Sequence, residues 1–155
     1  RLSADGLKEP LHYLGVLAYS MKQEDIEGFI RRLNLPATWA KVVRDVALAR
    51  ESAASLATES SAAVVCRRLR EMSLEAVEVA GALADSEGAR RNFQRYVQEW
   101  RHVKPRLNGR DLARLGVPLG PQVGKLLEEL RDARLEGRVH TKADEEALVR
   151  ECLAS

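Results

Sequence analysis

Residues 107–125 combine the residue types that a phosphate site needs: glycine, proline, arginine and lysine. They read LNGRDLARLGVPLGPQVGK, which predicts a short helix over 109–115, a tight turn, and a second helix that opens at Gly120. The first amides of a helix lack intrahelical partners and carry partial positive charge, so they suit an anion. Because Gly120 has no side chain, and Arg110 and Lys125 add charge, this turn is a candidate phosphate site.

Three backbone amides are the expected donors, those of Gln122, Val123 and Gly124, because the proline at the helix start has none. Gly124 would also let a sugar–phosphate backbone, or another helix, come close. The competing interpretation is that this glycine, with Gly116 and Gly120, serves only turn geometry and close helix packing. The residues alone leave both interpretations open.

Positive charge is concentrated near this turn, although the whole chain carries a formal net charge of only +2. Between Arg90 and Arg114 there are eight basic and two acidic residues, a net of +6, whereas the remainder has 17 basic and 21 acidic residues. Such a zone indicates an anionic partner. The alternative is a solvated helix face whose arginine stems cover apolar surface.

The elements that position these residues are predicted to be helices, because apolar residues recur at helical spacing and no segment alternates with period two. We expect an all-α array of about eight helices that forms one helical region, 1–155. A small, polar stretch near 52–61 is the candidate seam between body-like helices over 1–51 and a second part over 62–155.

Capping residues predict where individual helices begin and end. The first helix should follow Ser3 or Asp5 and carry Leu7, Leu11, Leu14 and Leu17 on one stripe. Ser73, Asn108 and Thr141 should cap helices, Asp85 or Ser86 should begin one, and Gly116 should end one. In the helix that carries Phe93, Tyr96 and Trp100 on one side, the basic residues Arg90, Arg91 and Arg95 fall off that stripe and should face solvent or a partner.

Catalytic motifs are missing from the sequence. It contains no G-x-S-x-G and no P-loop, and the D-x-E spacing of Asp85 and Glu87 lies between two helices, where capping explains the acidic residues. Cys66 and Cys152 are expected to be reduced packing residues of a cytoplasmic protein. No signal peptide and no membrane-spanning run is visible, and the chain starts at Arg1 as if cut from a longer protein.

The pattern Leu-x-Gly-Arg-Asp-Leu-x-x-Leu-Gly-Val-x-x-Gly-Pro-x-x-Gly-Lys-x-Leu over residues 107–127 resembles the C-terminal region of bacterial class II tRNA nucleotidyltransferases and poly(A) polymerases, which include CCA-adding and A-adding enzymes. Residues 61–64, 73–77, 96–105 and 130–137, and Thr141 after them, also look similar. The resemblance covers residues 55–155 well and the first fifty loosely.

The resemblance implies a helical body and tail that grips the acceptor and T-arm side of tRNA. In that family an N-terminal head uses Mg²⁺ and nucleoside triphosphates for transfer, and its Gly-Ser loop and D-x-D carboxylates are not in this sequence. We therefore assign no catalytic residue, metal ligand or cofactor here, expect the chain to be inactive alone, and expect tRNA or another structured RNA, and the head, as partners. The predicted RNA-binding residues are Arg90, Arg91, Arg95, Lys104, Arg106, Asn108, Gly109, Arg110, Gly120, Gly124 and Lys125.

Two alternatives remain at the level of sequence. A helical protein-interaction module would use the glycine turn structurally and would associate through an apolar patch that is insensitive to salt. A helix-hairpin-helix DNA-binding domain would share the Gly-x-x-Gly-Pro-x-x-Gly pattern and would prefer duplex DNA to tRNA.

Overall fold

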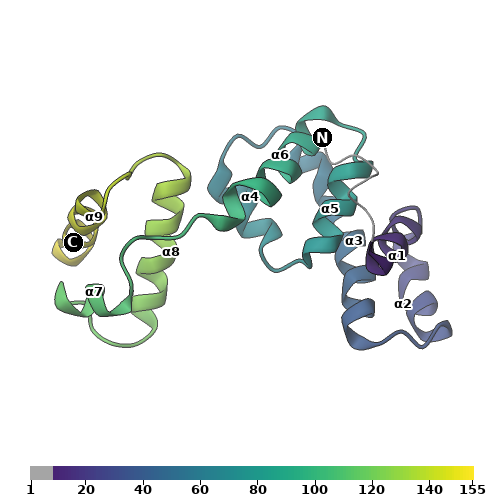
Figure 1. Cartoon of the computed structure of the whole chain (residues 1–155), viewed down its shortest axis with the longest axis horizontal. Helices are drawn as coiled ribbons and strands as arrows, with labels where there is room; N and C mark the ends of the chain where they lie inside the picture. Colours follow the sequence, from purple (N-terminus) through teal and green to yellow (C-terminus); the bar gives the residue numbers. More distant parts are fainter. Residues whose placement is uncertain (1–8) are drawn as a thin grey trace. The chain divides into compact units, whose positions relative to one another are not determined.

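The computed structural model describes residues 9–155, and these form nine α-helices and one short 3-10 helix without a β-strand (Figure 1). The predicted all-α fold is confirmed. The helices are α1 (Pro10–Tyr19), α2 (Gln23–Arg32), α3 (Ala37–Leu56), α4 (Ala62–Leu69), α5 (Leu74–Leu83), α6 (Glu87–Gln98), η2 (Trp100–His102), α7 (Gly109–Arg114), α8 (Pro121–Leu135) and α9 (Lys142–Ala154). The predicted helix start at Ser3 or Asp5 lies outside the described residues. In the described part, no helix has both the length and the hydropathy needed to cross a bilayer.

The chain forms two compact units. The first comprises the residues up to Ser60 together with Val64–Arg101, and the second comprises Ser61–Ala63 and His102–Ser155. The seam near 52–61 stays a prediction. In the structure α3 continues to Leu56, so the first part of this polar stretch is helical. Serine hydroxyls in this stretch bond back to carbonyl groups of the same helix, as Ser52 does to Leu48 at 2.9 Å, so the polar residues are accommodated within the helix.

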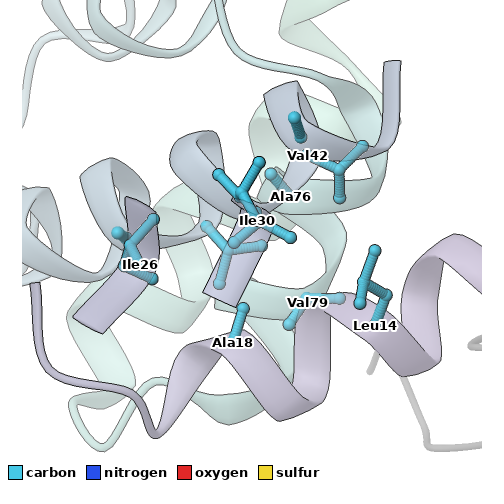
Figure 2. Packing of buried hydrophobic residues seen from close by; sticks show 11 residues of the cluster. Leu14, Ala18, Ile26, Ile30, Val42, Ala76 and Val79 are labelled. Carbon is cyan, nitrogen blue, oxygen red and sulfur yellow. The ribbon is translucent and has the colours of Figure 1, made fainter. Parts of the chain in front are cut away.

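The core of the first unit is built from small and β-branched side chains. Figure 2 shows how α1, α2, α3 and α5 contribute Leu14, Ile26, Val42 and Val79 to one buried cluster. The prediction that Leu17 lies on the buried stripe of α1 is wrong, since this side chain is 63% exposed. Gly15 and Ala18 face the core instead: a Cβ at Gly15 would lie 3.0 Å from a methyl group of Val79, so α1 packs very closely on α5.

Buried polar residues join the helices of the first unit. The carboxylate of Asp45, which is 6% exposed, accepts hydrogen bonds from Lys41 at 2.6 Å and from the backbone N–H of Ser73 at 2.7 Å. Ser73 does hold the N-cap position of α5, but its hydroxyl makes no cap bond, so Asp45 of α3 satisfies the helix start in its place. His12 of α1 contacts Glu78 of α5 at 2.5 Å.

The second unit packs α7, α8 and α9 around a small apolar core (Figure 1). The buried members of that core are Leu107, Leu112, Val117, Leu126, Leu130 and Val149. Thr141 caps α9 as predicted: its hydroxyl accepts from the amide of Asp144 at 3.1 Å, and the Asp144 carboxylate accepts from the amide of Thr141 at 2.8 Å. These reciprocal bonds form a capping box, which defines where α9 begins.

Candidate nucleic-acid interface

The start of α7 is defined by a capping box. The side-chain oxygen of Asn108 accepts from the amides of Arg110 at 2.9 Å and Asp111 at 3.1 Å, and the Asp111 carboxylate accepts from the amide of Asn108 at 3.0 Å. The side-chain oxygen of Asn108 therefore caps α7, as predicted, and is already engaged in hydrogen bonds within the protein. The exposed side chain of Arg110 follows directly on the capped residue.

The turn between α7 and α8 has a well-defined backbone. Gly116 ends α7 with a φ of 93°, and the next amide, of Val117, donates to the carbonyl of Leu112 at 3.0 Å, so the predicted left-handed stop is confirmed. Val117 and Leu112 are buried in the same core cluster, which anchors this side of the turn. Gly120 has a φ of 134°, a conformation that favours glycine, and Pro121 follows in the first turn of α8.

The N-terminus of α8 offers fewer free amides than the sequence predicted. The amide of Val123 donates to the carbonyl of Gly120 at 3.1 Å, so the expectation that it is a free donor is wrong. The first turn of α8 tightens into a bond between residues three apart, and such bonds are common at helix ends. The amide of Gln122 has no such bond among the described residues and faces the open end of the helix.

The surface over the first turn of α8 is uncovered. A Cβ placed at Gly120 or Gly124 would meet no heavy atom of the described residues within 4 Å. Close helix packing therefore does not explain Gly124 within this unit. At Gly109 the corresponding Cβ would lie 3.7 Å from a methyl group of Val123, which places the first turn of α7 beside the first turn of α8.

Exposed cations lie in the sequence segments on either side of this uncovered turn. Four predicted site residues have exposed side chains and, among residues 9–155, no carboxylate within 4.0 Å: Lys104, Arg106, Arg110 and Lys125. From Lys104 to Lys125 the sequence has five basic residues and one acidic residue, a net of +4. That acidic residue, Asp111, lies 3.6 Å from Lys142, and the hydrogen bond from the Asn108 amide lowers its pKa. Residues 104–125 thus carry a net positive charge, and their single carboxylate is already paired with Lys142.

One buried carboxylate holds the segment of backbone that carries Arg106. Glu145 of α9 is fully buried and accepts from the amides of Arg106 and Leu107, at 3.0 Å and 2.9 Å, and from the guanidinium of Arg134 at 2.9 Å. The sequence predicted a helix that begins after Thr141 but no role for Glu145. Its partners in the loop before α7 lie 38 and 39 positions away, and no local signal reveals them.

The other predicted cations lie on α6 of the first unit, and all three are exposed as expected. Arg90 donates to the carbonyl of Ala84 and lies 4.0 Å from Glu87. Arg95 lies 3.5 Å from Glu99 and 4.8 Å from the ring centroid of Trp100. Arg90 and Arg95 therefore have local partners that a ligand would have to compete with, and Arg91 has none among the described residues.

Comparison with curated proteins finds a similarity to an A-adding tRNA nucleotidyltransferase of Geobacter sulfurreducens. The two sequences are 28% identical over 140 residues. The alignment covers 86% of this chain and 16% of that protein, so the chain spans about a sixth of the relative's length. No family model matches the chain, and no solved structure matches it. The similarity indicates a relationship to the tRNA nucleotidyltransferase family.

Proposed function

We propose that this chain is a tRNA-binding, C-terminal region of a tRNA nucleotidyltransferase or poly(A) polymerase of the bacterial class II type, working in the cytoplasm. It grips the backbone of the acceptor and T-arm side of tRNA, while a catalytic head outside this sequence transfers the nucleotide. The observation that carries the proposal is the uncovered turn between α7 and α8. Exposed Arg106 before α7, Arg110 in α7 and Lys125 in α8 have no carboxylate partners among the described residues.

The chemistry of this turn suits a helical RNA stem. The deep, narrow major groove of such a stem excludes side chains, so proteins recognise its backbone and its shallow minor groove. At the turn, the amide of Gln122 and the partial positive charge of the α8 N-terminus would face a phosphate, and Gly124 leaves space for the sugar–phosphate chain. The cations nearby would hold the neighbouring phosphates by charge, with no preference for sequence.

The similarity to the A-adding enzyme supports tRNA as the RNA, because the aligned part covers most of this chain. The sequence pattern around Gly120 and Gly124 supports the same assignment. No residue of this chain is assigned to the transfer chemistry, and Mg²⁺ and nucleoside triphosphates are assigned to the head.

The test is tRNA binding by the whole chain over a series of salt concentrations. The variant that carries Arg110→Glu and Lys125→Glu should bind more weakly. The slope of its log affinity against log salt should be less steep by about one for each phosphate that the protein no longer neutralises. The control carries Lys22→Glu and Arg31→Glu, two exposed residues of the first unit, and has the same net charge. If the folded Arg110/Lys125 variant bound tRNA as tightly as the parent, the proposal would be wrong.

A preference of the parent chain for duplex DNA over tRNA in the same assay would favour the helix-hairpin-helix interpretation instead. A protein-interaction module has one observation in its favour: Tyr13 and Leu17, one turn apart on α1, are 61% and 63% exposed. Binding through that surface would not weaken as salt is raised, so the salt series separates the two functions.

A further inference from the structure

Leu119 is the most exposed large apolar side chain in the described part of the chain. It is 87% exposed, compared with 63% for Leu17 and 61% for Tyr13. A single exposed leucine is common on protein surfaces and by itself needs no explanation. Leu119 differs because of where it lies, in the turn that joins α7 to α8, directly before the N-cap residue Gly120.

Hydrogen bonds and prolines fix the backbone on both sides of Leu119. On one side, Val117 is 3% exposed and its amide bonds to Leu112, and Pro118 follows it. On the other side, Gly120 accepts from the amide of Val123 and leads into Pro121 of α8. Proline restricts φ at positions 118 and 121, so the backbone on both sides of Leu119 has few conformations. A leucine this exposed contributes little to the folded core.

The sequence around Leu119 is cationic. The sequence has no acidic residue from 112 to 127, and this stretch contains Arg114 and Lys125. The first turn of α7, with exposed Arg110, lies beside that of α8, since the Gly109 position contacts Val123. An apolar side chain beside exposed cations matches a polyanion that also presents apolar surface. RNA does so in its wide, shallow minor groove, where ribose and base edges are accessible.

We propose that Leu119 is an RNA-contacting residue that packs against a ribose or base in the minor groove, between phosphates held by the cations of the turn. This inference rests on the proposed function and adds to it a contact that charge does not provide. The cations would supply affinity that depends on salt, and Leu119 would supply affinity that depends on shape and burial. Leu119 would therefore favour a helical stem over a flexible anion of equal charge.

The test compares tRNA binding by the parent, Leu119→Ala, Leu119→Gln and Leu119→Met across a salt series. Burying a leucine side chain is worth about a tenfold change in affinity, so the Ala and Gln variants should bind about tenfold more weakly. Their salt slopes should equal that of the parent, because an apolar residue releases no counterions. Leu119→Met should bind like the parent, because it keeps the apolar volume.

Leu17→Ala, which removes the next most exposed leucine among residues 9–155, is the matched control and should leave the affinity unchanged. Thermal unfolding of all variants should match the parent within a few degrees, which removes loss of fold as an explanation. If Leu119→Ala binds tRNA as tightly as the parent while the parent shows steep salt dependence, this inference is wrong and the proposed function stands. If the parent does not bind tRNA, both are wrong.

A membrane is the competing partner for an apolar residue among cations. Vesicles of phosphatidylcholine with phosphatidylserine provide that test in the same buffer. Binding of the parent to these vesicles that is lost in Leu119→Ala, together with unchanged tRNA binding, would overturn the assignment to RNA.

Discussion

The guanidinium of Arg134 donates a hydrogen bond to the carboxylate of Glu145 at 2.9 Å, and the Glu145 side chain is fully buried. The same carboxylate accepts from the amides of Arg106 and Leu107. One side chain of α9 thus connects α8 to the loop before α7. The position of Arg106 in the candidate interface depends on this connection.

Glu145→Ala should therefore destabilise the protein strongly. The change leaves two amides without their acceptor and Arg134 without its partner, and breaking such a buried pair costs about 3 kcal/mol. Urea unfolding measures the loss. Glu146→Ala is the control on the same helix, because Glu146 forms a more exposed pair with Arg150 at 3.5 Å and should change stability by less than about 1 kcal/mol. Equal losses in the two variants would show that Glu145 does not connect these segments.

Two glycines of the first unit should respond in opposite directions to the same substitution. A Cβ at Gly88 would lie 2.1 Å from the carbonyl oxygen of Ala57, so Gly88→Ala forces α6 away from the end of α3 and should destabilise by about 1–3 kcal/mol. A Cβ at Gly28, in the middle of α2, meets nothing within 4 Å, so Gly28→Ala should stabilise by about 0.5–1 kcal/mol. Thermal melts of the two variants check the signs, and a stable Gly88→Ala protein would contradict the close approach.

The local sequence predicted the structure well where the hydrogen-bond partners of a residue lie within a few positions of it in the chain. Asn108, Thr141 and Gly116 hold their predicted positions because caps and left-handed stops depend on neighbouring residues. Partners from distant segments could not be predicted. The acceptor for the Ser73 amide is Asp45, 28 positions away, and the bond between them depends on how α3 packs on α5.

In the candidate site, too, some features could be predicted from the local sequence and others could not. The exposure of Arg110 and Lys125 followed from their types and from the turn between them, and both are exposed. The occupied amide of Val123 and the open space at Gly124 depend on exact backbone positions, which composition and periodicity do not determine. The sequence therefore predicted which of these side chains are exposed but not which backbone donors are free.

The caps of α7 and α9 should make stability depend on pH in the acidic range. Hydrogen bonds from the Asn108 amide lower the pKa of Asp111, and those from the His140 and Thr141 amides lower the pKa of Asp144, from the ordinary value of 3.8. A carboxyl whose pKa is lower in the folded state stabilises the fold above its unfolded pKa, and this contribution is lost as the pH falls through the folded pKa. Asp111→Asn and Asp144→Asn should thus weaken the protein at about pH 7 and leave it close to the parent at about pH 2.

Urea midpoints at several pH values measure this difference. Asp25→Asn is the control, because Asp25 lies in the first turn of α2, where the N-cap residue makes no side-chain cap bond. A gap between parent and variant that stays constant from neutral to strongly acidic pH would contradict a role for the ionised caps.

Substitution of Gly124 should change the stability of the protein and its affinity for tRNA in opposite directions. It lies in the first turn of α8 with open space where a Cβ would be, so Gly124→Ala should stabilise the helix by about 0.5–1 kcal/mol. In the proposed complex that space is taken by the RNA backbone, so the same methyl group should lower the affinity for tRNA. Gly28→Ala should give a similar gain in stability without any loss of affinity. A Gly124→Ala protein that is more stable and binds tRNA as well as the parent would show that the RNA backbone does not approach α8 at this residue.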